Sequence, residues 1–460
     1  MSRRLFGTDG VRGVANETIT PELALSLGMA AGRWMREQGL TRRAVIGRDT
    51  RRSGPMLGAA LASGLCSAGI EVATLGVVPT PTVSFAARTG EFGLGVVISA
   101  SHNPAPDNGI KFLGHDGRKL SDEAELLIEA LLGAVPADRF SGADVGYLHP
   151  DTELIEAYMA FLLGIVPEGL AGLKVAVDAA HGAAHELAPR VLRALGAIVS
   201  PIGVTPDGMN INAEGGATKP HVIQQSTVAS GSDVGVAFDG DADRAVFSDE
   251  TGRLINGDRT MGVWATHRQR DGGLHPPTVV GTVMSNGGFE EYLRSNGIGL
   301  ERTPVGDKYV SQKLDETGAQ IGGEQSGHIV FPHHGPTGDG LVTMLEFLGV
   351  LRQAGCPAST FIDAYGAWPQ LLVNVHVSAL AGWDQGRAVC AALEEGRAAL
   401  GTGGRLVVRA SGTQPMVRVM VEARDGALRD EVAQRIVAAM TDEIGAKVYS
   451  RVDLTHSLGE

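Results

Sequence analysis

Apolar residues in the first third of the chain alternate between helical and strand spacing. Spacings of three and four residues predict a helix over 21–38, carried by Leu23, Leu27, Ala30, Ala31 and Trp34. A second helix, rich in small residues, is predicted near 56–68, and short apolar runs at 44–47, 72–77 and 94–98 predict buried strands. Strands that alternate with helices of this length indicate βαβ crossovers and a mostly parallel sheet.

The same alternation begins twice more along the chain. The expected elements of the second round are strands at 173–178, 198–204 and 233–238 and a helix at 184–195. Those of the third round are a strand at 279–283 and helices at 287–296 and 309–316. Three successive α/β units of about 100 residues each therefore form a repeat of architecture.

The last 90 or so residues follow a different order, β-α-β-β-α-β, which is typical of a split βαβ unit. Strands are expected at 371–377, 405–409, 416–422 and 447–451. One helix carries Val389, Leu393 and Leu400, and the other carries Leu428, Val432, Ile436 and Met440 and ends at Gly445. We expect a separate α+β domain here.

Proline, glycine and polar residues gather near 150, 252 and 368, where domain boundaries are expected. The predicted domains are 1–150, 151–252, 253–368 and 369–460. The fold class is α/β: three successive related domains with mixed, mostly parallel sheets, followed by the C-terminal α+β domain.

Composition narrows the function classes. The net charge of −13 disfavours nucleic acid and acidic membranes as partners, and any anionic substrate needs a local basic cluster. The 64 glycines are about twice the usual share, which indicates tight loops around a ligand. Neither a signal peptide nor a membrane span is expected, and the three cysteines have no disulfide or metal spacing, so a cytoplasmic protein is predicted.

The first candidate loop, Ile-Ser-Ala-Ser-His-Asn-Pro at 98–104, follows a buried strand and continues to Lys111. Ser101 would lie at the carboxyl edge of a parallel sheet, where open α/β sheets bind ligands. His102 and Lys111 add positive charge or proton-transfer capacity. The segment also fits an ordinary polar turn.

The second loop, Asp-Gly-Asp-Ala-Asp-Arg at 239–244, follows an apolar strand. Asp239, Asp241 and Asp243 can converge on one hard cation, and magnesium leaves coordination positions open for phosphate oxygens. A solvated acidic turn is the alternative. The loop therefore suggests phosphate chemistry.

Two further loops complete the set. Gly-Gly-Glu-Gln-Ser-Gly-His at 322–328 offers Glu324 and Ser326 to vicinal hydroxyls or an amine of a sugar. Arg-Ala-Ser-Gly-Thr-Gln-Pro at 409–415, with Arg418 on the next strand, forms a dianion site and the basic cluster that an acidic chain needs. Each also fits a simple turn. Together the four loops supply a nucleophile, a cation, a polyol reader and a phosphate anchor.

These motifs, in this order over nearly the full chain, resemble the α-D-phosphohexomutase superfamily, and the loops at 98–111 and 322–328 resemble its glucosamine-phosphate branch more closely than its mannose- or glucose-phosphate branches. The resemblance implies four domains around a central cleft. It also implies phosphorylation of Ser101 and a Mg²⁺ ion held by the Ser101 phosphate, Asp239, Asp241 and Asp243, with Arg244 in a supporting role.

Further site roles follow from the same resemblance. Lys111, His102, Arg12 and His328 would serve proton transfer or charge stabilisation, and Glu324 and Ser326 would bind the sugar. The phosphate-binding residues would be Arg409, Ser411, Gly412, Thr413 and Arg418. Two positions depart from the usual pattern: Ala242 replaces a glycine and Gln414 replaces a glutamate. The methyl group of Ala242 is tolerated unless the position needs a positive φ.

The implied reaction interconverts glucosamine 6-phosphate and glucosamine 1-phosphate through a phosphoserine enzyme and a 1,6-bisphosphate, and feeds amino-sugar nucleotide and cell-wall precursor synthesis. Glucosamine or glucose 1,6-bisphosphate would serve as activator, and the expected partner is a small hexosamine phosphate, with the chain a monomer or homodimer. Three alternatives remain: a phosphomannomutase or phosphoglucomutase, a metal-dependent phosphatase, and a non-catalytic sugar-phosphate binding protein.

Overall fold

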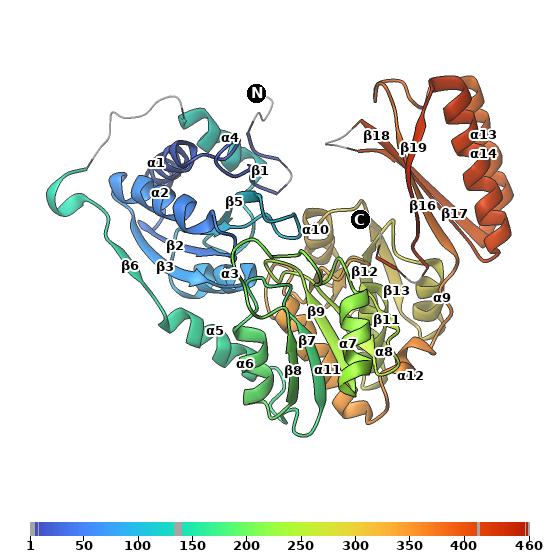
Figure 1. Ribbon diagram of the computed structural model, residues 1–460, viewed down its shortest axis with the longest axis horizontal. Helices are drawn as coiled ribbons and strands as arrows, with labels where there is room; N and C mark the ends of the chain where they lie inside the picture. The colour runs from blue at the N-terminus through green and yellow to red at the C-terminus, as the bar shows by residue number, and fades with distance from the viewer. Residues whose placement is uncertain (1–4, 8, 133–139, 412–414, 456, 459–460) are drawn as a thin grey trace. The chain divides into compact units, whose positions relative to one another are not determined.

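The computed structural model describes most of the chain (Figure 1), namely residues 5–7, 9–132, 140–411, 415–455 and 457–458. The chain divides into two compact units: the first comprises Met1–Gly257 and Gly327–Ser359, and the second comprises Asp258–Ser326 and Thr360–Glu460. Across the described ranges, no helix combines the length and the apolar character that a bilayer crossing requires.

A six-stranded sheet in the order β1-β5-β4-β2-β3-β6 organises the start of the first unit. β4, β2, β3 and β6 are parallel, whereas β5 and β1 add an antiparallel edge. The strands are β1 (Val11–Val14), β2 (Arg43–Arg48), β3 (Glu71–Val77), β4 (Leu94–Ile98), β5 (Asp107–Gly114) and β6 (Leu148–Pro150). The helices are α1 (Pro21–Glu37), α2 (Gly54–Ser67), α3 (Thr80–Thr89), α4 (Asp122–Leu131), the 3₁₀ turn η1 (Gly142–Asp144) and α5 (Glu153–Leu163). The mixed, mostly parallel sheet confirms the predicted fold class.

Both faces of this sheet are covered. Side chains alternate along a strand, so Val96 and Ile98 join the core beneath α1 and α2, while Val97 joins the core beneath α3. A strand buried on both faces reads as a continuous apolar run, as the segment 94–98 does. The result is a three-layer α/β/α arrangement.

The register of the antiparallel edge brings two cations to the carboxyl end of β4. Lys111 on β5 pairs with Val97, and Arg12 on β1 pairs with Gly109. The Ser101 loop leaves the sheet directly after Ile98, so the sheet itself places the hydroxyl and both basic side chains at one edge.

A second sheet, in the order β11-β10-β9-β7-β8, follows in the same unit. Its elements are β7 (Lys174–Asp178), α6 (Leu187–Ala194), β8 (Ile198–Ile202), α7 (His221–Ser230), β9 (Val234–Phe238), β10 (Ala245–Asp249) and β11 (Leu254–Ile255). β7, β8 and β9 are parallel, whereas β9 and β10 form an antiparallel hairpin that pairs Phe238 with Ala245. The acidic loop 239–244 is therefore the tip of a hairpin.

The helix predicted over 184–195 starts later than expected. α6 begins at Leu187, after a series of turns in which Ala180 and His181 both adopt positive φ angles. Residues 181–186 form turns, and apolar spacing alone does not distinguish such turns from the first turn of a helix. The predicted start at Ala184 was wrong by three residues.

β15 (Ile329–Val330) and α11 (Gly340–Ala354) complete the first unit. Asp339 caps α11, because its Oδ1 accepts hydrogen bonds from the backbone N–H groups of Leu341 and Val342, both at 3.0 Å. Its Oδ2 accepts a 2.7 Å bond from the hydroxyl of Tyr158. The N–H of Gly340 binds the carbonyl of Ala242 at 3.0 Å, so the start of α11 supports the acidic loop.

Replacing Asp339 with asparagine is expected to change how stability depends on pH. Burial raises the pKa of Asp339 from 3.8 to about 6, so folding favours the neutral acid. This contribution is fully present below pH about 3.8 and is lost as the pH rises through about 6. The shift corresponds to about 3 kcal/mol, and the larger part of it falls between about pH 4.5 and about pH 7.5.

The measurement is denaturant unfolding of both proteins at those two pH values. Asparagine keeps the cap and can bond Tyr158, so Asp339→Asn should gain about 2 kcal/mol relative to the parent as the pH rises. A difference that is the same at both pH values would contradict the argument.

The first part of the second unit is built on the parallel strands β13, β12 and β14. Its elements before the C-terminal domain are α8 (Gly257–Arg270), β12 (Thr278–Thr282), α9 (Gly287–Ser295), β13 (Gly299–Thr303), α10 (Asp307–Thr317) and β14 (Gly322–Gly323), and α12 (Ser359–Ile362) lies where the chain re-enters the unit. The strand and both helices predicted for the third round are confirmed.

The C-terminal part is a four-stranded antiparallel sheet in the order β17-β18-β16-β19. Its elements are β16 (Gln370–His376), α13 (Arg387–Leu400), the 3₁₀ turn η2 (Gly401–Gly403), β17 (Gly404–Ala410), β18 (Met416–Ala423), α14 (Gly426–Ile444) and β19 (Lys447–Asp453). Helices α13 and α14 lie side by side and share one core with the sheet (Figure 1). The predicted β-α-β-β-α-β order and the helix end at Gly445 are confirmed.

A buried ion pair joins this domain to the start of α9. The Glu422 carboxylate is fully buried, accepts a 3.0 Å bond from the N–H of Gly287 and pairs with Arg405 at 2.8 Å. Arg405 also donates to the carbonyl of Ser285 at 2.6 Å. Removal of either partner would leave a buried charge uncompensated. The ion pair, with its bonds to the start of α9, therefore holds the two parts of the second unit together.

Candidate functional site

Ser101 occupies a strained and buried position just beyond β4. Its φ of 52° lies in the left-handed region, and 3% of its surface is exposed. Its Oγ donates a 2.8 Å hydrogen bond to Oδ2 of Asp239, and its backbone N–H donates to Ser99 Oγ at 2.9 Å. A non-glycine residue at positive φ persists where surrounding contacts dictate it, which is common at functional sites. The hydroxyl is thus aimed at the acidic loop.

Arg51 binds several backbone carbonyls of the Ser101 loop and is the main residue that sequence reasoning missed. Its side chain is fully buried, and Nη2 donates to the carbonyls of Ser101 at 2.9 Å and Asn103 at 2.7 Å. Nη1 donates to the carbonyl of Asp107 at 2.9 Å, and Nε pairs with Asp49 at 2.8 Å. The available signal was a cluster of charged residues directly after the buried strand at 44–47.

The acidic loop forms the densest group of carboxylates near Ser101. Asp239, Asp241 and Asp243 each offer an oxygen within 4.8 Å of the others, and Asp239 and Asp241 are buried. Burial, followed by the charges of Asp243 and Asp241, raises the pKa of Asp239. Burial also opposes ionisation of Asp241, but Lys111 and the hydroxyl of Thr80 lower its pKa. Three carboxylates held this closely need a compensating cation.

Two buried oxygens show where such a cation fits. Among the described residues, Oδ1 of Asp241 and Oδ1 of Asp243 are buried without a hydrogen-bond partner. Buried polar atoms are normally satisfied, and carboxylate oxygens suit hard divalent cations. The residues present therefore fit a metal ion, which Asp239, Asp241 and Asp243 would hold.

The loop can approach Ser101 because position 240 is glycine. A Cβ at Gly240 would lie 2.5 Å from the carbonyl oxygen of Ser101 and 2.7 Å from Nδ2 of Asn212. Asn212 itself donates to the Ser101 carbonyl at 2.8 Å. Any side chain at position 240 would separate the serine from the carboxylates.

The backbone of Ala242 adopts a positive φ, which is the case in which its methyl group was expected to matter. Its φ is 57°, in the left-handed region that glycine adopts freely. The conformation costs an L-residue about 1 kcal/mol or somewhat more, which the buried loop tolerates.

Lys111 bridges the acidic loop to the N-terminal segment. Its Nζ lies 3.2 Å from Oδ2 of Asp241 and 3.0 Å from Oδ2 of Asp9, and Asp9 also pairs with Arg12. Burial disfavours the ammonium ion, but Asp241 and Asp9 outweigh it and raise the pKa of Lys111. Asp9, like Thr80, was missed from sequence, where one aspartate among glycines carries no distinctive signal.

Two histidines flank the same centre. Nδ1 of His102 lies 3.4 Å from Oγ of Ser101, and Nδ1 of His328 lies 3.7 Å from Oδ2 of Asp243. Arg244, the last residue of the acidic loop, forms a β-bridge with His328 and donates its backbone N–H to Asp239 at 3.3 Å. The first unit thus brings together the predicted residues Ser101, His102, Lys111, Arg12, Asp239, Asp241, Asp243, Arg244 and His328.

The predicted sugar-binding residues lie in the second unit. Oε1 of Glu324 accepts a 2.9 Å bond from the N–H of Gly306, and Oε2 is 3.5 Å from the hydroxyl of Ser326. The backbone contact orients the carboxylate and leaves Oε2 beside a hydroxyl. Such a pair can contact polyol or amine groups.

The predicted phosphate anchor also lies in the second unit. Arg409 on β17 pairs directly with Arg418 on β18, and burial together with the Arg418 charge lowers the pKa of Arg409. Like charges placed opposite each other are destabilising unless an anion lies between or beside them. Ser411 is buried next to them, whereas Gly412, Thr413 and Gln414 lie outside the described residues.

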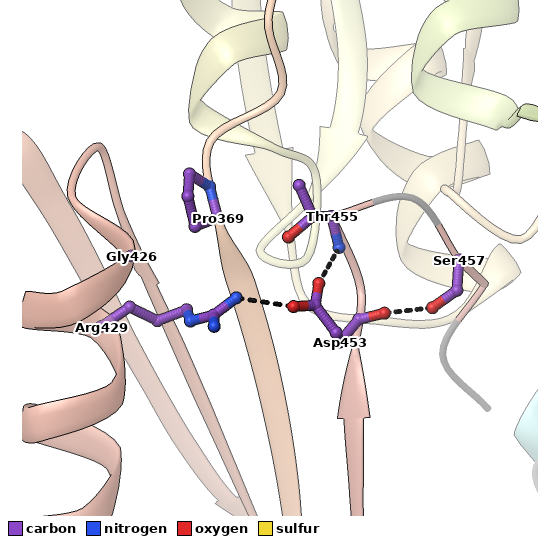
Figure 2. A pocket seen from close by; sticks show the side chains of 6 residues that line it. All are labelled: Pro369, Gly426, Arg429, Asp453, Thr455 and Ser457. Carbon is purple, nitrogen blue, oxygen red and sulfur yellow. Dashed lines mark hydrogen bonds and ion pairs between the residues drawn. The ribbon is translucent and has the colours of Figure 1, made fainter.

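A separate pocket of about 410 Å³ lies at the end of β19, an edge strand of the C-terminal sheet (Figure 2). Figure 2 shows Arg429 pointing at Asp453, with which it pairs at 2.8 Å, while Thr455 and Ser457 also bond Asp453. Asp453 already neutralises the charge of Arg429 in this pocket. None of the residues that line the pocket is a predicted site residue. We therefore place no phosphate there.

Family models match nearly all of the chain. Domains I, II and III of the phosphoglucomutase/phosphomannomutase family, each described as alpha/beta/alpha, match residues 3–137, 156–252 and 256–367. The C-terminal domain of the same family matches residues 372–439.

Individual proteins agree with these matches. The phosphoglucosamine mutase of Desulforudis audaxviator is 48% identical over 95% of this chain and 98% of its own length. That of Symbiobacterium thermophilum is 47% identical over 96% and 99%. The crystal structure of a phosphoglucomutase/phosphomannomutase family protein from Burkholderia thailandensis superimposes with a TM-score of 0.80 at 27% identity, covering 96% of this chain and 98% of that one. With all four domain models matched in order, the chain belongs to the phosphoglucomutase/phosphomannomutase family.

Proposed function

We propose that the protein interconverts glucosamine 6-phosphate and glucosamine 1-phosphate by phosphoryl transfer through Ser101. The observation that carries this proposal is the 2.8 Å contact between the Ser101 hydroxyl and Asp239, inside a cluster of carboxylates that fits a metal ion. The sugar is inferred from relatives at 48% and 47% identity, which are phosphoglucosamine mutases.

In the first half-reaction, O1 of the 6-phosphosugar attacks the phosphorus of phosphoserine 101. The bond between phosphorus and Oγ breaks as the bond to O1 forms, the O1 proton leaves, and Oγ takes up a proton. We assign the transfer of a proton to Oγ to His102, whose Nδ1 lies 3.4 Å from Oγ. The product of this step is the 1,6-bisphosphate.

In the second half-reaction, the reoriented bisphosphate returns the phosphoryl group on O6 to Ser101 and leaves as the 1-phosphate. Positioning supplies much of the acceleration in such transfers. Arg51 orients the serine loop through its carbonyls, and Lys111 adds a buried positive charge beside Asp241. A free 1,6-bisphosphate can rephosphorylate Ser101, so glucosamine or glucose 1,6-bisphosphate would act as an activator.

We assign Mg²⁺ to the acidic loop, with Asp239, Asp241 and Asp243 as its protein ligands and the Ser101 phosphate as a further one. When bound, it would neutralise charge on the oxygens of the transferring group. The open oxygens of Asp241 and Asp243 support this assignment.

The phosphate that does not react requires its own anchor, which we assign to Arg409, Ser411 and Arg418. Arg418→Ala should raise the KM for the phosphosugar by about 10- to 100-fold, because a charge-assisted bond contributes about 1.5–3 kcal/mol. Steady-state kinetics of Arg418→Ala measure this change in KM. Arg435→Ala, which removes an exposed arginine of α14, is the control. Equal KM values in both variants would exclude Arg418 as the anchor.

Substrate choice is tested by comparing kcat/KM for glucosamine 6-phosphate, glucose 6-phosphate and mannose 6-phosphate, while inorganic phosphate is measured. We expect the highest value for the amino sugar and almost no phosphate release. Preference for glucose or mannose phosphate would indicate a phosphoglucomutase or phosphomannomutase, stoichiometric phosphate release a phosphatase, and binding without turnover a sugar-phosphate binding protein.

We further propose that the reaction takes place in the cytoplasm. Cys66, Cys356 and Cys390 are all free thiols of intermediate burial, which suits a reducing compartment. The product would there feed amino-sugar nucleotide synthesis.

A further inference from the structure

A second group of side chains of the types that ligate metals lies outside the site described above. It consists of His333 and His334, on the loop between β15 and α11, and Glu346 on α11. One donor atom of each lies within 4.8 Å of the other two. None of the three side chains takes part in the proposed transfer reaction.

The three side chains already converge on one point. Nε2 of His334 lies 2.5 Å from Oε1 of Glu346, and Nε2 of His333 lies 3.6 Å from the same oxygen. The two imidazole rings have centroids 4.1 Å apart. In a tetrahedral zinc site with bonds of about 2.0–2.1 Å, neighbouring ligand atoms are about 3.3 Å apart. The His333 distance matches this value, and His334 would need to move by under about 1 Å.

Neighbouring residues hold His334 in place, whereas His333 is exposed to solvent. The ring of His334 packs against Phe161 with centroids 5.7 Å apart, and its carbonyl accepts a 2.5 Å hydrogen bond from Arg88. The side chain of His333, by contrast, is 44% exposed. A cation can therefore enter from solvent, and water can complete its coordination.

The ligand atoms of this cluster favour a different metal from the one that the acidic loop favours. Two imidazoles and one carboxylate are borderline ligands that favour zinc and related transition metals, whereas the all-carboxylate loop favours hard cations such as magnesium. We propose that His333, His334 and Glu346 form a second metal site, which binds one divalent transition-metal ion of the zinc type.

Such an ion would link the loop 331–338 to α11. Because His334 also contacts Phe161 of α5 and Arg88 of α3, the ion would hold three helices of the first unit together. Ligands that bind only the folded state raise its stability. Zinc should therefore raise the Tm of the full chain while saturating magnesium occupies the acidic loop.

The experiment uses the full-length protein without an affinity tag, in excess Mg²⁺. Co²⁺ is titrated and followed by its visible absorption, Zn²⁺ is titrated by calorimetry, and Tm is recorded with and without Zn²⁺. The variants are His333→Ala and the double variant His333→Ala/His334→Ala. His221→Ala, an exposed histidine of α7, is the matched control.

We expect one equivalent of Zn²⁺ to bind to the parent and to the control. Binding should be at least about tenfold weaker in His333→Ala and undetectable in the double variant, whose Tm should no longer respond to Zn²⁺. Equal affinity in the parent and His333→Ala, or no zinc binding by the parent, would overturn the proposal. Loss of the proposed mutase activity would not affect this test, because every readout is binding or stability.

Discussion

Ser101→Ala is expected to lower turnover by at least about 10³-fold, even with glucose 1,6-bisphosphate supplied. The hydroxyl is the group that the mechanism phosphorylates, and it lies at a buried position, 2.8 Å from Asp239. An activator can restore the phosphoryl group only where a nucleophile exists to accept it. Assays of glucosamine 1-phosphate formation, with and without activator, measure the loss.

The matched control is Ser63→Ala on the exposed face of α2, where the hydroxyl donates to the carbonyl of Ala59. It should retain the parent rate. Turnover by Ser101→Ala within tenfold of the parent would mean that Ser101 is not the phosphoryl carrier.

Arg51→Lys is expected to lower kcat by about 10²-fold and to cost about 2–4 kcal/mol of stability. Lysine keeps the charge beside Asp49, but a single ammonium cannot reach the carbonyls of Ser101, Asn103 and Asp107 together. Buried carbonyls would lose their donors, and Ser101, held at a positive φ, would lose one of the two side chains that bind its carbonyl.

Arg52→Lys is the natural control, because Arg52 is the next residue in the chain and is exposed. Kinetics and denaturant unfolding of both variants separate a local effect from a general one. A kcat for Arg51→Lys within twofold of the parent would show that the serine loop holds its geometry without the guanidinium.

The α/β class and the C-terminal order were predictable because they rest on periodicity. A short run that is apolar at every position, such as 94–98, is typical of an inner strand buried on both faces, and the loop after it then lies at the ligand-binding edge. The acidic loop was predictable for a similar reason, since three alternate aspartates after an apolar strand have few structural uses.

Residues that act through distant segments were not predictable in this way. Arg51 matters because its guanidinium meets carbonyls some 50 residues further along, and Asp9 matters because β1 pairs with β5. Local pattern carries neither fact. The left-handed conformation of Ala242 was hidden likewise, because backbone strain is set by tertiary contacts. The predicted domain boundaries and the roles assigned to site residues stay predictions.

Intact-mass spectrometry of freshly purified protein tests the central claim, that Ser101 stores a phosphoryl group, most directly. We predict a species about 80 Da heavier than the polypeptide, the mass of one phosphoryl group, which is absent from Ser101→Ala and transferred to sugar when 6-phosphosugar is added. An added mass that persists in Ser101→Ala, or parent protein that stays unmodified after incubation with glucose 1,6-bisphosphate, would contradict the account.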